Sequence, residues 1–177
     1  MYRQLRFLLS FFLCFTVFYC FHIGYIGATS KGGIYFAILD RHVNYITLWR
    51  HAYISIAAWT LNQLGYIVYT TDTTLKVYGH SGFRLVYSCL GYGVMSFFSA
   101  FVLTFPKPIR SRIIFLVSGL AVIFILNLSR FILIPLFYNP RINVLSINHH
   151  DIFNISLYLV IIVMIYRWVN STLNCRR

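Results

Sequence analysis

Five apolar runs, separated by short polar or basic segments, constrain this chain more than any other feature. Hydrophobic residues make up 59% of its 177 residues, and charged residues only 10%. A helix needs about 20 apolar residues to cross a bilayer, so this length fits about five spans with short loops. The sequence therefore predicts an all-α polytopic membrane protein, folded as one membrane-embedded domain over residues 1–177.

The expected spans follow from the apolar runs and the polar residues that bound them. They cover residues 7–27, 51–69, 89–105, 113–127 and 152–168. Residues 33–39 are also apolar but too few to span, so we expect an interfacial or re-entrant segment there. A sixth crossing at this segment is the alternative.

The longest polar loop, residues 70–84, leads directly into a cysteine. Polar and apolar residues alternate in Thr74–Tyr78 and again in Phe83–Tyr87, with Gly79–Gly82 between them. Alternation on both sides of a glycine-containing turn predicts a small β-hairpin. We expect it to rest on the external membrane surface just before Cys89.

The net charge of +12 is carried by basic residues in short segments between apolar runs, which is typical of membrane flanks and not of a nucleic-acid surface. Five spans put the basic segments 107–112 and 167–177 on one side together with Lys31, Arg41 and Arg50, so that side carries nine of the 15 basic residues. The positive-inside rule makes that side cytoplasmic. The sequence thus predicts a multi-pass protein of the cytoplasmic (inner) membrane, with Arg3 and Arg6 left outside.

Three reactive side-chain types fall together on the non-cytoplasmic side: Cys89 starts the third span, Arg130 ends the fourth and His150 opens the fifth. A thiolate is the nucleophilic form of cysteine, and a helix N-terminus or a cation stabilises it. A histidine can carry the proton. An arginine can orient a carbonyl or stabilise an oxyanion.

Three neighbours support or replace these residues. Asn127 lies three residues before Arg130 and shares its helix face. Asp151 follows His150, and His149 is the alternative active histidine. The pattern therefore predicts a cysteine-based catalytic site.

Each residue also has a structural interpretation. A cysteine in a span usually packs as a small apolar residue, and an arginine at a helix end usually reaches toward the headgroups. A metal site is a further alternative, formed by His149, His150, Asp151 and His80. Adjacent helical residues point in different directions and this spacing matches no known site, so we expect no metal or cofactor.

The sequence resembles the exosortase/archaeosortase family of membrane-embedded cysteine transpeptidases over about residues 45–170. The pieces that carry the resemblance are Cys89-Leu90-Gly91, Asn127-Leu128-Ser129-Arg130 and His150-Asp151, in this order on successive spans. The chain departs from the family at Leu90, where a small residue is frequent, and at Asn154, where glycine is common. These departures suggest a compact subfamily.

The resemblance implies a cysteine peptidase that cleaves C-terminal sorting signals of exported proteins, each a short motif, a transmembrane helix and a basic cluster. Transfer of the cleaved protein to an envelope acceptor is the further expected step. Cys89 would be the nucleophile, Arg130 the substrate or oxyanion stabiliser and His150 the proton carrier. Exported proteins and membrane lipid are the expected partners. The rival hypotheses are a non-catalytic membrane partner in envelope or polysaccharide assembly, and a metal-dependent membrane hydrolase.

Overall fold

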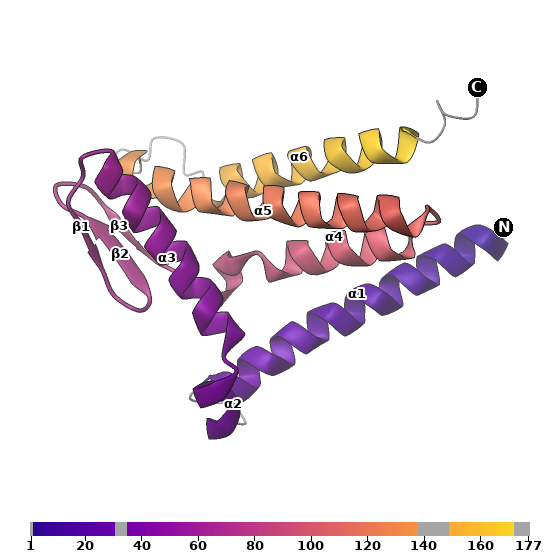
Figure 1. Cartoon of the computed structure of the whole chain (residues 1–177), viewed down its shortest axis with the longest axis horizontal. Helices are drawn as coiled ribbons and strands as arrows, with labels where there is room; N and C mark the ends of the chain where they lie inside the picture. Colours follow the sequence, from indigo (N-terminus) through magenta and orange to yellow (C-terminus); the bar gives the residue numbers. More distant parts are fainter. Residues whose placement is uncertain (1, 31–34, 138–148, 172–177) are drawn as a thin grey trace.

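The computed structural model describes residues 2–30, 35–137 and 149–171, without the side chains of Arg3 and of residues 149–152. Helices dominate the fold, as predicted (Figure 1). They are α1 (Tyr2–Thr29), α2 (Ala37–His42), α3 (Tyr45–Gln63), α4 (Tyr92–Thr104), α5 (Ile109–Phe137) and α6 (His149–Asn170). Between α3 and α4 lie β1 (Val68–Thr70), β2 (Thr74–Val77), β3 (Gly82–Arg84) and a 3₁₀ turn, Tyr87–Leu90.

Within the described residues, four segments are long and apolar enough to cross a membrane. They are Gln4–Thr29, Tyr87–Thr104, Ile109–Phe137 and Phe153–Asn170. Helix α3 overlaps the expected second span, 51–69, but it ends at Gln63 and is not among these four. Arg50 and His51 lie inside α3, which lowers its mean hydropathy. In Figure 1, α3 runs obliquely to the other long helices, at one end of the molecule.

The start of α1 and the end of α6 lie at the opposite end of the molecule. Figure 1 shows the N-terminus, the turn between α4 and α5 and the end of α6 there, whereas α2, α3 and the strands lie at the other end. The expected interfacial segment 33–39 contributes its last three residues to α2, which has only six residues. A helix this short cannot cross a bilayer.

The strands form an antiparallel sheet in the order β1-β2-β3. Strands β2 and β3 are the predicted hairpin, with Leu75 opposite Phe83. Strand β1 was assigned by the sequence to the end of a span, and it pairs with β2 through Val68 opposite Val77. Leu75 and Val77 are fully buried while Lys76 is exposed, so one face of β2 packs on the helices.

Asn44 caps α3 by accepting a hydrogen bond from the Thr47 amide.

Aromatic rings join the sheet, α3 and α5. Tyr53 of α3 stacks on Phe124 with ring centroids 4.6 Å apart, and Phe131 packs on Tyr53 at 5.3 Å. Phe83 of β3 stacks on the same Phe131. This cluster holds the C-terminal half of α5 in place, where the candidate site lies.

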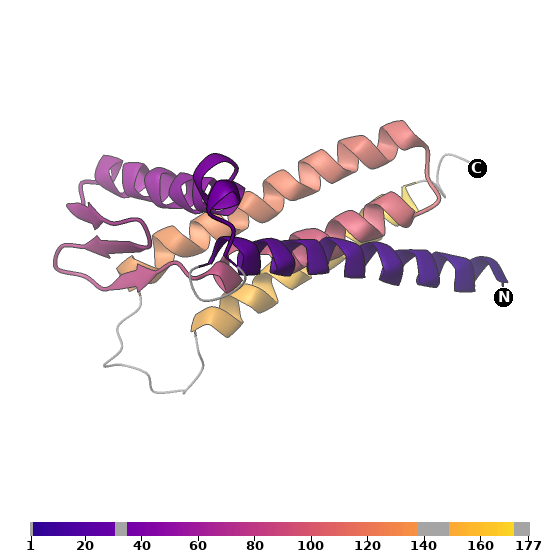
Figure 2. The same ribbon diagram turned by 90° about the horizontal axis from the view of Figure 1, so that it is seen from below.

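The membrane helices pack side by side (Figure 2). Helix α1 packs along α4, which packs on α5, and α5 on α6. A Cβ at Gly119 of α5 would lie 2.1 Å from the Phe98 ring of α4, so the glycine permits this close approach.

Candidate active site

Cys89 lies in the 3₁₀ turn Tyr87–Leu90, where its amide donates a 3.0 Å hydrogen bond to the Val86 carbonyl. Gly91 follows in the left-handed conformation with φ of 78°, and α4 starts only at Tyr92. Cys89 therefore does not lie in the first turn of α4, as the sequence led us to expect, because the left-handed Gly91 separates the 3₁₀ turn from α4. The electrostatic support for a thiolate must come from a neighbouring side chain.

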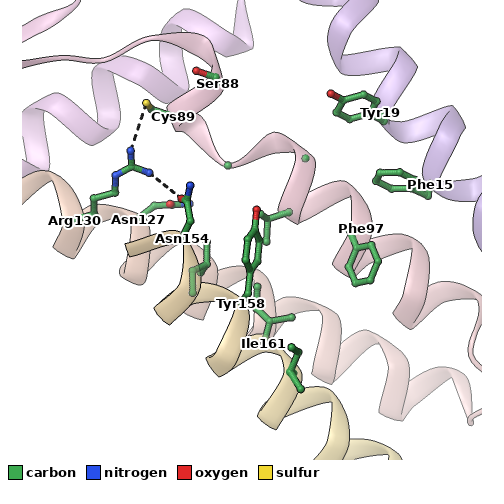
Figure 3. A pocket seen from close by; sticks show the side chains of 15 residues that line it. Phe15, Tyr19, Ser88, Cys89, Phe97, Asn127, Arg130, Asn154, Tyr158 and Ile161 are labelled. Atoms are coloured by element: carbon green, nitrogen blue, oxygen red, sulfur yellow. Dashed lines mark hydrogen bonds between the residues drawn. The ribbon is translucent and has the colours of Figure 1, made fainter. Parts of the chain in front are cut away.

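Arg130 supplies that neighbouring charge. Its Nη2 lies 3.7 Å from Cys89 Sγ, and its Nη1 donates to Asn154 Oδ1 at 3.3 Å (Figure 3). The sequence placed Arg130 at the end of a span before Pro135, but α5 continues through that proline to Phe137. Arg130 is therefore interior, and only 6% of it is exposed. It does not reach toward headgroups as an arginine at a helix end would.

Asn127 lies one turn before Arg130 and is also buried, at 4% exposure. Both line the same cavity, as their spacing indicates. The Asn127 Nδ2 atom would lie 2.4 Å from a Cβ at position 91, so the glycine turn beside Cys89 packs on this amide. The Tyr53 hydroxyl of α3 interacts with this amide, but the buried nitrogen has no well-aligned hydrogen bond among the described residues. Such a nitrogen can donate a hydrogen bond to a ligand.

His149, His150 and Asp151 form the start of α6, but their side chains lie outside the described residues. Their catalytic or supporting roles remain predictions. Asn154, four residues after His150, accepts a hydrogen bond from Arg130, so Asn154 lies on the face of α6 that is turned toward α5.

Asn154 is a site residue that sequence reasoning missed, since it stood out only as a departure from the resembled family. The available signal was an amide in an apolar run, one helical turn after a histidine. Tyr158, a further turn along, also lines the cavity. Its contribution could not be predicted, because it depends on how α6 packs.

The site lies at one end of a cavity of about 580 Å³. The polar end is formed by Ser88, Cys89, Asn127, Arg130 and Asn154. From there the cavity continues between apolar and aromatic side chains of α1, α4 and α6 (Figure 3). The arrangement suits a ligand with a polar reacting group at one end and an apolar body.

The metal alternative is not tested by this geometry. Within the described part of the chain, no three His, Cys, Asp or Glu side chains gather as ligands. His80 instead packs against the Tyr66 ring, with centroids 5.4 Å apart. The other candidate ligands, at positions 149–151, lie outside the described side chains.

In a comparison with protein families, the model of the transmembrane exosortase family matches residues 33–167. The matched residues include Cys89, Arg130 and His150, whereas α1 lies before them. No curated protein and no solved structure matches the chain.

Proposed function

Because the chain belongs to the transmembrane exosortase family, we propose that it is a membrane cysteine peptidase and transpeptidase that cleaves C-terminal sorting signals of exported proteins. One observation carries the proposal: a buried guanidinium lies 3.7 Å from the Cys89 sulfur at the polar end of a cavity. A cation this close to the sulfur favours the thiolate, which is the nucleophilic form of cysteine.

The first half of the proposed reaction is acylation. The Cys89 thiol gives its proton to His150, and the thiolate attacks the carbonyl carbon of the scissile peptide bond. Arg130 and the Asn127 amide stabilise the oxyanion. The C–N bond then breaks, and the leaving amine takes the proton from His150. The product is a thioester between Cys89 and the N-terminal part of the substrate.

The second half regenerates the enzyme. Water, or a hydroxyl or amine of an envelope acceptor, attacks the thioester carbonyl and gives its proton to His150. The C–S bond breaks and the Cys89 sulfur takes up a proton again. Water yields a cleaved protein, and an acceptor yields a transferred one. No cofactor enters either half.

We place the reaction on the non-cytoplasmic face of the cytoplasmic (inner) membrane. The end of the molecule away from the start of α4 carries a basic turn, with Lys107, Arg110 and Arg112, and Arg167 near the end of α6. With α3 not counted as a span, Arg3 and Arg6 join this side while Lys31, Arg41 and Arg50 leave it, so it carries eight of the 15 basic residues. The positive-inside rule then gives the same orientation. The external N-terminus implied by five spans is then no longer needed.

The test is co-expression with an exported protein that carries a C-terminal motif, an apolar helix and a basic cluster. Intact mass of that protein shows loss of its C-terminal segment, and any mass added at the new C-terminus identifies transfer. We expect processing by the wild type and by Cys20→Ala, which removes an exposed cysteine of α1. Cys89→Ala and Arg130→Ala should leave the protein unprocessed.

The rivals predict other outcomes. Processing that is unchanged in Cys89→Ala would favour a non-catalytic partner in envelope or polysaccharide assembly. Loss of processing with a chelator, and its persistence after thiol alkylation, would favour a metal-dependent hydrolase. The cysteine mechanism requires sensitivity to alkylation and resistance to the chelator.

A further inference from the structure

The apolar part of the cavity is a groove between two helices that hardly touch one another. Helix α1 packs on α4 and α6 packs on α5, while α1 and α6 share few contacts over their described residues. Figure 3 shows Phe15 and Tyr19 of α1 across the cavity from Tyr158 and Ile161 of α6. We call the space lined by these four residues, Phe97 and Leu157 the α1–α6 groove.

The groove is open at the surface of the helix bundle and continuous with Cys89. Tyr19 and Phe97 are each 42% exposed, and Tyr158 is 50% exposed. Of the described residues that line the whole cavity, Arg130 is the charged one, and it lies at the reactive end. An occupant must therefore present a polar reacting group to Cys89 and an uncharged, apolar body to the groove.

We propose that the apolar transmembrane helix that follows the scissile bond of the protein substrate binds in the α1–α6 groove. We further propose that the side chains of α1 that line the groove select this helix. The inference rests on the proposed function. Cys89 acts on the carbonyl of one residue, so the chain that continues after that residue must leave the polar end. The groove is a continuous path from there into the apolar layer.

Hydrogen-bond donors at the junction favour a peptide over a lipid chain as the occupant. A peptide that is extended at the scissile bond exposes backbone carbonyls, which must find donors at membrane depth. The Asn127 nitrogen is buried beside the Tyr53 hydroxyl and has no well-aligned hydrogen bond among the described residues. The Tyr158 hydroxyl points up the cavity toward the glycine turn before α4 (Figure 3). Gly93 also lines the cavity, where a Cβ would stand 3.7 Å from the Tyr19 ring of α1.

Helix α1 is suited to select the substrate because it lies outside the family match. The matched residues begin at 33, after α1 ends at Thr29. Cys89, Arg130 and Asn154 thus lie inside the matched region, and Phe15 and Tyr19 lie before it. Selection by α1 would leave the reactive end unchanged while altering which helix fits.

Photo-crosslinking tests the docking. p-Benzoylphenylalanine replaces Phe15 or Tyr19 in the Cys89→Ala variant, and the signal-bearing protein is co-expressed. Leu13 and Val17, 69% and 57% exposed on α1, serve as matched control positions outside the cavity lining. We expect cross-links to the apolar helix of the substrate from positions 15 and 19, at least tenfold stronger than from 13 and 17. Equal cross-linking at all four positions, or cross-links to lipid alone, would overturn the docking.

Selectivity is tested with Phe15→Ala/Tyr19→Ala against Leu13→Ala/Val17→Ala, both with Cys89 intact. Loss of two large apolar contacts should raise KM for the signal-bearing protein about tenfold or more. The value of kcat should stay within about twofold, and the control pair should match the wild type. Equal KM in both pairs would overturn selection by α1.

The two proposals fail in distinguishable ways. Wild-type cleavage with no groove-specific cross-link refutes the docking alone. A groove-specific cross-link without any cleavage refutes the peptidase function and retains the docking. Absence of both refutes both proposals.

Discussion

At the scale of single residues, one buried arginine organises the reactive end of the cavity. Arg130 contacts a sulfur from the turn before α4 and an amide from α6, so it links three segments far apart in sequence. Cys89, Asn127 and Arg130 could be singled out from the sequence because they are chemically unusual at the edges of apolar runs. Asn154 could not be assigned to Arg130, because that contact depends on the packing of α6 against α5.

Asn154 is expected to position Arg130 without touching the substrate's reacting atoms. In Asn154→Ala the guanidinium loses the hydrogen bond at Nη1 and its fixed position beside the sulfur. A hydrogen bond from a charged group contributes about 1.5–3 kcal/mol, so kcat should fall about tenfold or more. KM and the amount of folded protein should change little. Asn154→Gln should recover part of kcat. A rise in KM with kcat unchanged in Asn154→Ala would contradict this role.

Gly91 is expected to be irreplaceable for both its conformation and its space. An alanine there would keep φ at 78° and place its Cβ 2.4 Å from the Asn127 amide. The left-handed conformation costs a non-glycine residue about 1–2 kcal/mol, and the contact adds to that. Processing by Gly91→Ala should fall at least tenfold, because the turn that carries Cys89 must shift.

Gly79 offers the matched control. It has a φ of 75°, but a Cβ there would meet nothing within 4 Å. Gly79→Ala thus imposes the same backbone strain without the contact. Equal loss of processing in the two variants would mean that strain alone, and not packing on Asn127, explains the requirement for glycine.

At the scale of elements, the polar alternation before Cys89 sufficed to predict the hairpin of β2 and β3. Strand β1 was missed because its apolar residues continue the composition of α3.

The proline at position 135 was expected to stop α5, yet the helix includes it and ends at Phe137. A proline in the last helical turns removes only one backbone donor. Its carbonyl accepts a hydrogen bond from the Ser81 hydroxyl of the β2–β3 turn.

Lys107 is expected to hold the α4–α5 turn against the end of α6. Its ammonium donates to the Trp168 carbonyl and the Ser171 hydroxyl, and lies 4.2 Å from the centre of the Trp168 ring. Burial lowers the pKa of Lys107, so these contacts offset an unfavourable desolvation. Lys107→Met should reduce the free energy of unfolding by about 1–3 kcal/mol.

Thermal unfolding in detergent measures the loss, with Arg110→Met as the control. Arg110 lies in the same basic segment but is exposed. Its replacement removes a charge without these contacts and should leave Tm nearly unchanged. Equal Tm values for both variants would contradict a stabilising role for the Lys107 contacts.

At the scale of the whole molecule, the main difference from the sequence prediction is the number of crossings. Composition was sufficient to predict a helical polytopic membrane protein. It did not show that α3 lies obliquely beside the sheet, because 19 helical residues are long enough to be mistaken for a span. Four crossings put the N-terminus and the end of α6 on the same side, whereas five would separate them.

Labelling with a membrane-impermeant maleimide on intact cells distinguishes these topologies. Single cysteines replace Tyr2, His80 or Arg110, which are all exposed, in a background with the natural cysteines changed to alanine. Four crossings predict that only the cysteine at position 80 reacts from outside. The other two should react after permeabilisation. External labelling at position 2 would restore the five-span topology.

The measurement that tests the central claim most directly is the mass of the protein itself during a single turnover. The purified full chain, in excess over a signal-bearing substrate, is quenched with acid, analysed intact and then digested. We predict an added mass equal to the substrate fragment before the cut, attached to the peptide containing Cys89 and released by hydroxylamine. Cys20→Ala should form the same adduct and Cys89→Ala none. Cleavage of the substrate by Cys89→Ala at the wild-type rate would contradict Cys89 as the nucleophile.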